Sequence, residues 1–151
     1  MSLETKIMEQ IKEAMKAKNS IALEALRAVK SELQLLETSG GKASVSEAQE
    51  IALLQKLIKQ RKEAAEHFSA NDRKELAEKE IAQADIIQAF LPEQFSEEEL
   101  TLKLQEIIDQ IGANSPQDMG KVMGMATAQF AGKAEGKMIA ATVKKLLSTN
   151  N

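Results

Sequence analysis

The stretch SPQDMGKVMGMATAQFAGKAEGK, residues 115–137, combines helix-start signals with glycines and lysines. Its opening Ser-Pro pair is typical of an N-cap followed by proline at the first helical position, and Asp118 stands in the place of a capping box. Gly120 and Gly124 then fall inside the predicted helix, although each glycine costs a helix about 1 kcal/mol relative to alanine. Two explanations are open: a close helix–helix crossing, or a partner that approaches the backbone.

A second group of glycines and lysines follows in the same stretch, at the predicted start of a helix over about 134–147. Helix N-termini present free N–H groups and the positive end of the helix dipole, which suit phosphate. The candidate phosphate-binding residues of the stretch are Gly120, Lys121, Gly124, Gly132, Lys133, Gly136 and Lys137. The alternative is that the glycines serve helix packing while the lysines are solvated.

The sequence holds no recognisable catalytic constellation. His67 is the single histidine, there is no cysteine, and no GxSxG nucleophile elbow occurs. The segment from Gly132 to Lys137 departs from the Walker pattern, which needs four residues between its glycines and then Lys followed by Ser or Thr. We therefore predict no catalytic residues, no metal site and no cofactor, and we expect His67 to be a helix-end residue near Phe68.

The composition favours helix nearly throughout, because long stretches of Ala, Leu, Glu, Lys, Gln and Ile are interrupted by only two prolines and seven glycines. Apolar residues at helical spacing predict helices over about 2–18, 20–37, 44–68, 73–91, 96–111, 116–129 and 134–147. Pro92 disfavours helix in the residue before it and divides the chain. We expect an all-α protein with an N-terminal domain of helical hairpins or a bundle over 1–92 and a C-terminal three-helix unit over 93–151.

Two of these helix starts carry a capping box, in which Ser or Thr is followed three residues later by Glu or Gln. Ser44 with Glu47 predicts the start of the third helix. Ser96 with Glu99 predicts the start of the fifth.

One pair of opposite charges falls within the apolar stripes of two neighbouring helices. At 100° per residue, Arg61 lies in the stripe of the third helix and Glu80 in that of the fourth. An antiparallel hairpin turning near residues 70–71 would bring the two side chains together, and an unpaired buried charge costs several kcal/mol. The spacing predicts a structural ion pair between Arg61 and Glu80, with a ligand-facing role as the alternative.

The net charge of −3 provides no global field that attracts nucleic acid, but the charge is unevenly distributed. Residues 93–111 hold six acids and one lysine, whereas residues 112–151 hold five lysines and two acids. Aromatic residues make up 3% of the chain, which disfavours stacking on unpaired bases. The lack of cysteine excludes disulfides, and no apolar run approaches the roughly 20 residues that span a bilayer. These features predict a cytoplasmic protein with no membrane partner.

Several motifs spread along the chain resemble the stand-alone YqeY proteins of the GatB/YqeY family. They are LRAVKSEL at 26–33, KQRKE at 59–63, FLPEQFSEEEL at 90–100, DMGKVMG at 118–124 and GKAEGK at 132–137. The resemblance runs from end to end, and the combination is more specific than any one piece. It implies an all-α fold with two helical parts.

The resemblance also implies kinship with the tail domain of the B subunit of the glutamine-dependent aminoacyl-tRNA amidotransferase. In that enzyme the tail helps to hold the tRNA, while the chemistry lies in other domains and another subunit. The family often carries a carbon–nitrogen ligase label, and this sequence offers no residues to perform such a reaction.

Three functions follow as hypotheses. The first is a non-catalytic helical module that binds tRNA, or a tRNA-handling enzyme, through the surface around Lys121, Lys133 and Lys137. The second is an accessory component of a glutamine-dependent amidotransferase, in contact with its subunits. The third is a protein-interaction module without a nucleic-acid role, which the acidic segment from Glu93 to Asp109 favours because it would repel phosphate.

Overall fold

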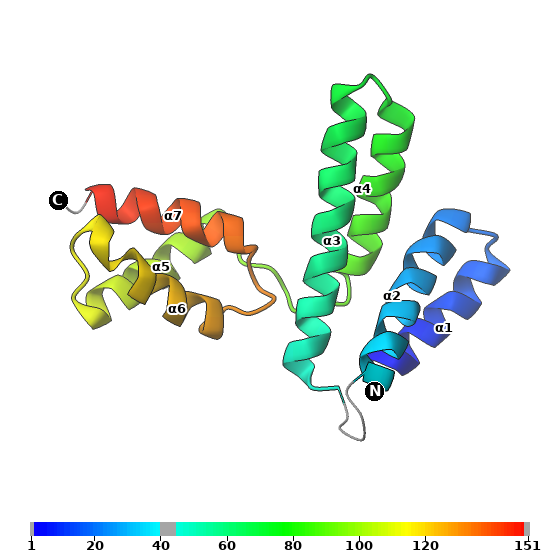
Figure 1. Ribbon diagram of the computed structural model, residues 1–151, viewed down its shortest axis with the longest axis horizontal. Helices are drawn as coiled ribbons and strands as arrows, with labels where there is room; N and C mark the ends of the chain where they lie inside the picture. The colour runs from blue at the N-terminus through cyan, green and yellow to red at the C-terminus, as the bar shows by residue number, and fades with distance from the viewer. Residues whose placement is uncertain (1, 40–44, 150–151) are drawn as a thin grey trace. The chain divides into compact units, whose positions relative to one another are not determined.

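A computed structural model describes residues 2–39 and 45–149, and these residues form seven α-helices and one 3₁₀ turn without a β-strand (Figure 1). The all-α prediction is confirmed. The chain divides into two compact units, Met1–Leu91 and Pro92–Asn151.

The N-terminal unit consists of four helices. They are α1 (Leu3–Lys16), α2 (Ser20–Ser39), α3 (Glu47–Ala70) and α4 (Lys74–Gln88). The capping box of α3 is formed by Ser46 and Gln49, whose side chains each bind the backbone N–H of the other residue. The box predicted from Ser44 and Glu47 is therefore wrong: Glu47 is the first helical residue, and Ser44 lies outside the described residues.

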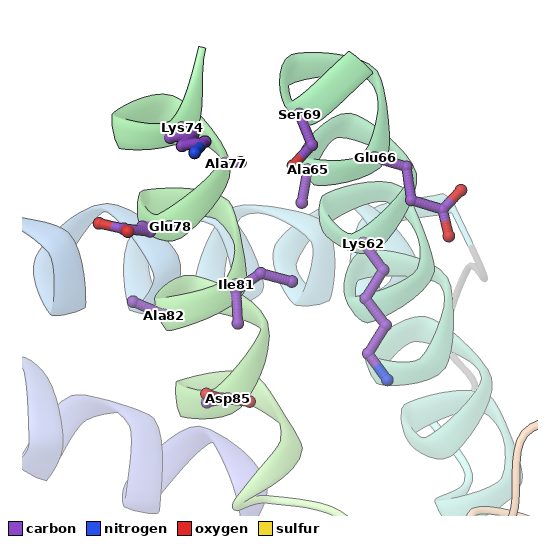
Figure 2. A pocket seen from close by; sticks show the side chains of 10 residues that line it. All are labelled: Lys62, Ala65, Glu66, Ser69, Lys74, Ala77, Glu78, Ile81, Ala82 and Asp85. Carbon is purple, nitrogen blue, oxygen red and sulfur yellow. The ribbon is translucent and has the colours of Figure 1, made fainter. Parts of the chain in front are cut away.

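α3 and α4 form a long antiparallel hairpin whose turn extends past the beginning of α2 (Figure 1). At its turn, Arg73 N donates to Phe68 O at 2.8 Å, and Asp72 adopts the left-handed conformation with φ 58°. His67 is exposed in the last turn of α3, with its ring centroid 6.4 Å from that of Phe68, so the helix-end prediction for His67 is confirmed. One face of the hairpin carries an open groove of about 920 Å³ (Figure 2).

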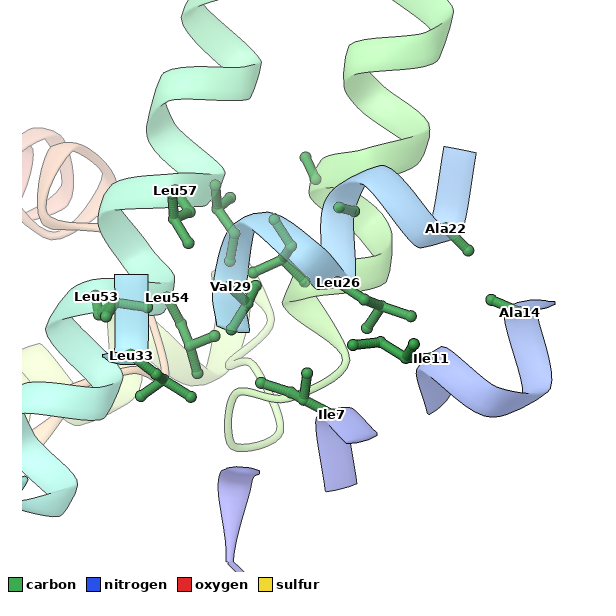
Figure 3. Close-up of a cluster of buried hydrophobic side chains, with 14 residues drawn as sticks. Ile7, Ile11, Ala14, Ala22, Leu26, Val29, Leu33, Leu53, Leu54 and Leu57 are labelled. Carbon is green, nitrogen blue, oxygen red and sulfur yellow. The ribbon is translucent and has the colours of Figure 1, made fainter. Parts of the chain in front are cut away.

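The core of the N-terminal unit lies where α1 and α2 pack against the parts of α3 and α4 remote from their turn. Figure 3 shows Ile7 and Ile11 of α1 and Leu26 of α2 converging with the leucines of α3. Each such side chain contributes about 1.5–3 kcal/mol when it is fully buried. The most deeply buried members are Ile7, Ala25, Leu26, Val29, Leu54, Ala84 and Ile87.

A polar group at the edge of this core differs from the one that the helical spacing predicts. Arg61 Nε donates to Gln83 Oε1 at 3.1 Å, and Arg61 Nη1 donates to the Leu57 carbonyl at 3.3 Å. Gln83 is only 3% exposed, and its Nε2 has no hydrogen bond of normal geometry among the described residues. Arg61 therefore pairs with Gln83, one turn beyond Glu80, and the predicted Arg61–Glu80 ion pair is corrected.

An ion pair between α2 and α4 lies beside Arg61. Lys79 Nζ is 3.0 Å from Glu24 Oε2. The hydrogen bond from Lys79 is the main cause that lowers the pKa of Glu24, and the charges of Lys79 and Arg61 act in the same direction. The Gln83 amide also favours the ionised carboxylate.

Stability should depend on pH through Glu24. Because its pKa is lower in the folded state, its contribution is present above the unfolded pKa and is lost as the pH falls through the folded pKa. Both side chains are substantially exposed, so we expect Glu24→Gln to cost about 0.2–1 kcal/mol at pH 7. Urea titrations should show the difference from wild type shrink as the pH falls below about 4.3, the usual pKa of an unfolded glutamate. A difference in stability between wild type and Glu24→Gln that stays the same at neutral and at acidic pH would contradict the lowered pKa of Glu24.

The C-terminal unit contains α5 (Glu97–Ile111), the 3₁₀ turn η1 (Pro116–Asp118), α6 (Met119–Gln129) and α7 (Gly136–Thr149). The capping box of Ser96 and Glu99 is confirmed at the start of α5, and Gly112 ends the helix with φ 69°. The buried core joins all three helices through Leu100, Leu104, Ile107, Ile108, Val122, Ala126, Ile139, Val143 and Leu147.

The start of α6 differs from the predicted capping box. Ser115 makes no side-chain cap, and the turn η1 precedes the α-helix. Asp118 instead accepts from Asn114 N at 3.1 Å and from Ser115 Oγ at 3.4 Å. The Asp118 carboxylate therefore links the loop before the helix to the turn η1. Pro116 is compatible with this tight 3₁₀ turn.

Candidate functional site

Gly120 and Gly124 lie one turn apart on the exposed face of α6. A Cβ added at either position would meet nothing within 4 Å. The buried face of the helix is formed instead by Val122 and Ala126. A close helix–helix crossing within the described residues is therefore not the reason for these glycines, and the first of the two explanations is wrong.

Lys121 lies beside this open backbone and is exposed. Its nearest charged neighbour in sequence is Asp118, whose pKa is lowered mainly by the hydrogen bond from Asn114 N and also by the charge of Lys121. The carboxylate stays ionised at neutral pH and partly offsets the lysine. A phosphate at Lys121 would have to compete with it.

Gly132 has a structural role in the turn between α6 and α7. It is buried, with φ 78°, and its carbonyl accepts a hydrogen bond from Gln94 Nε2. A residue other than glycine would be strained at this φ. Gly132 therefore forms the turn between α6 and α7 and does not expose its backbone to a partner.

Lys133 is exposed, and its side chain is held over an aromatic ring. Its Nζ is 5.6 Å from the centroid of Phe95, and Phe95 N donates to the Lys133 carbonyl at 2.9 Å. Phe95 in turn meets Phe130 edge to face, with 5.3 Å between the ring centroids. The packing of the two phenylalanines thus places a ring beneath the ammonium group and favours one position of the lysine side chain.

Gly136 is the first residue of α7 and is exposed, with open space where a Cβ would point. Ile139 N donates to Glu135 O at 3.0 Å, so the N–H groups of Gly136, Lys137 and Met138 precede the first intrahelical bond. They share the positive end of the helix dipole with the exposed Lys137. This end of α7 can accept an anion.

The candidate residues do not gather in one pocket. α6 and α7 run in opposite directions (Figure 1), so Lys121 lies at the start of α6 while Lys133 and Lys137 lie beyond its other end. From Lys121 to the end of α6 at Gln129 the helix rises about 12 Å. The structure therefore places two small basic points on one unit, separated by about the axial rise of three to four nucleotides of one strand.

Comparison with known proteins accounts for both units. A family model described as Yqey-like protein matches residues 4–147. The chain belongs to the YqeY-like protein family. The resemblance inferred from the sequence motifs is thereby confirmed at the level of the family. No curated protein matches the chain.

Sequence reasoning assigned no role to Gln94 and Phe95 of this YqeY-like protein, although both lie in one of the motifs that mark the family resemblance. They tie the segment before α5 to the α6–α7 turn through the bonds to Gly132 and Lys133. The sequence feature that could have indicated this role is Phe95, an aromatic residue between polar neighbours in a segment without helical spacing.

No group of three His, Cys, Asp or Glu side chains within residues 2–39 and 45–149 of this YqeY-like protein is arranged to hold a metal ion. In the same part of the chain, no helix has both the length and the apolar character that crossing a membrane requires.

Proposed function

We propose that this YqeY-like protein is a non-catalytic helical module that binds tRNA, or a tRNA-handling enzyme, through the exposed surface of its C-terminal unit. The observation that carries the proposal is the open backbone at Gly120 and Gly124 beside Lys121. Glycine is costly in the interior of a helix, where Gly124 lies, and to a lesser degree in the first turn, where Gly120 lies, and the packing of the described residues requires neither glycine. Close approach of a polyanion to the backbone would explain their presence.

The second basic point adds to this surface. Lys133 and Lys137 stand next to the first N–H groups of α7, a combination that suits a phosphate. Gly132 contributes by shaping the turn that positions Lys133, not by direct contact. The separation of the two points favours a partner with several phosphates along a backbone over a small phosphate ligand.

We expect replacement of Lys121, Lys133 and Lys137 by alanine to weaken tRNA binding at least about tenfold and to flatten its salt dependence by about one logarithmic slope unit per lysine. Fluorescence anisotropy with labelled total tRNA, from about 20 to 200 mM salt, measures both. The matched control replaces the exposed Lys6, Lys12 and Lys16 of α1, which changes the net charge equally. Equal losses in both triple variants would mean that only net charge matters.

One observation favours a protein partner as the second candidate. On α5, Leu102 is 67% exposed between the acidic side chains Glu98 and Glu106, which lie four residues to either side. An exposed leucine on an acidic helix face suits a basic protein surface and repels nucleic acid. Failure of the unmodified protein to bind tRNA at low salt would favour this candidate, and co-purification with an amidase subunit would favour an accessory role in glutamine-dependent amide transfer.

A further inference from the structure

The end of the α3–α4 hairpin nearest its turn lacks a large buried side chain. From residue 59 to residue 82, the buried side chains are only Ala65 and Ala77. The large apolar side chains of this part of α4, Leu76 and Ile81, are 38% and 43% exposed. Two helices whose fully buried contacts are two alanines, with Phe68 only half-buried at the turn, bury little apolar surface, so an additional partner would stabilise this end.

The groove on this part of the hairpin has an apolar floor and charged ends. Ala65, Ala77, Ile81 and Ala82 line it, and Figure 2 shows Ile81 between the two helices. In the same view Lys74 lies at the end near the turn, and Asp85 lies at the opposite end. Along α4, the groove therefore has a positive charge near the turn and a negative charge at the opposite end.

Both charges oppose the dipole of their own helix. Lys74 is the first residue of α4, where the dipole is positive, and Asp85 lies in the last turn, where it is negative. Among the described residues neither forms an ion pair. Each charge is thus in the less favourable place for an isolated helix and in the better place for a helix that runs antiparallel to it.

We propose that the groove is the contact by which two copies of this chain associate, with the two α4 helices antiparallel. A twofold axis level with residues 79 and 80 brings Lys74 of each copy opposite Asp85 of the other. The same axis brings Ile81 of each copy onto the apolar floor of its partner. Two ion pairs then form with opposed dipoles, and the two hairpins make a four-helix arrangement.

The charged residues around the groove favour a second copy of the chain as the partner. The charged lining residues are Lys62, Glu66, Lys74, Glu78 and Asp85, so the surface has no single sign that would attract a polyanion. When two copies of α4 lie antiparallel, the positive end of each helix face meets the negative end of the other. The surface is then complementary to itself, as an isologous interface requires. Twelve residues of α4 span about 18 Å, so the area buried between two such helices should be smaller than that of a standard interface. The dimer should therefore be weak, with a dissociation constant of about 10⁻⁵–10⁻⁴ M.

Charge exchange tests the proposal in the full chain. Sedimentation equilibrium should show the unmodified protein passing from monomer to dimer between about 5 and 500 µM. Lys74→Glu and Asp85→Lys should each weaken association at least tenfold, and the combined variant should restore it. Lys74→Glu removes a cation from the start of α4, so helical content measured by circular dichroism should not fall.

A matched exchange outside the groove provides the control. Lys59 and Glu63 form an exposed pair on α3, 3.9 Å apart, and exchanging the two residues should leave association unchanged. Persistence of the monomer at every concentration would overturn the proposal. Failure of the combined Lys74→Glu and Asp85→Lys variant to restore the dimer would also overturn it.

Discussion

Replacing Leu104 with alanine should remove a large part of the stability of the C-terminal unit while leaving that of the N-terminal unit unchanged. Leu104 is fully buried at the centre of the α5–α6–α7 core. A buried Leu→Ala change costs about 2–5 kcal/mol, and a unit of this size has only about 3–9 kcal/mol of stability in total. Thermal melts followed by circular dichroism should show one transition move to a markedly lower temperature, and limited proteolysis on warming should leave a fragment that ends near Pro92.

The same helix offers a matched control. Leu102→Ala removes the same atoms from a side chain that is 67% exposed, so its cost should stay below about 0.5 kcal/mol. Equal effects of the two variants would show that the assigned core of α5 is wrong. Simultaneous unfolding of both units in Leu104→Ala would show that the two units do not unfold independently.

The helices could be predicted because local signals and the apolar spacing agree along the chain. At α5, Ser96 and Glu99 start the helix, Gly112 ends it, and the leucines and isoleucines between them lie on one buried face. No tertiary contact has to be known to place such an element. The limits of α5 therefore agree with the prediction to within a residue.

Errors arose where two local solutions compete or where one residue sets the orientation of a helix. Ser44 with Glu47 and Ser46 with Gln49 satisfy the same capping rule, and the sequence gives no reason to prefer the second. On α4 the predicted apolar stripe contains Glu80, but Leu76, one turn before it on the same face, is 38% exposed. The buried face instead follows small residues such as Ala77, which carry a weak hydrophobic signal.

The candidate site was predictable in its residues but not in its geometry. Glycine in a helix signals that something unusual happens at Gly120 and Gly124, yet only the coordinates distinguish open space from a close crossing. The sequence spacing of Gly132 and Gly136 is also silent on backbone conformation. One has a positive φ and closes a turn, while the other begins a helix.

Replacing Gly120 and Gly124 together with alanine should stabilise the C-terminal unit by about 1–2 kcal/mol and weaken tRNA binding. Alanine at Gly124 removes the interior helix penalty of glycine, about 0.8–1.0 kcal/mol, whereas alanine at Gly120 in the first turn removes less. Both methyl groups enter open space. The same methyl groups would hold a phosphate backbone away from α6. Urea titration measures the gain in stability, and anisotropy with labelled tRNA measures the loss of binding.

The opposite signs of the two effects make this pair of measurements decisive, since a general loss of folding cannot produce them. Gly132→Ala is the contrasting control: the same methyl group at φ 78° should destabilise the unit by about 1–2 kcal/mol, because left-handed backbone strains any residue with a Cβ. Binding that stays unchanged in the stabilised double variant would show that no ligand approaches α6 through its glycines. A double variant that gains no stability would mean that a contact absent from the described residues already fills the space beside them.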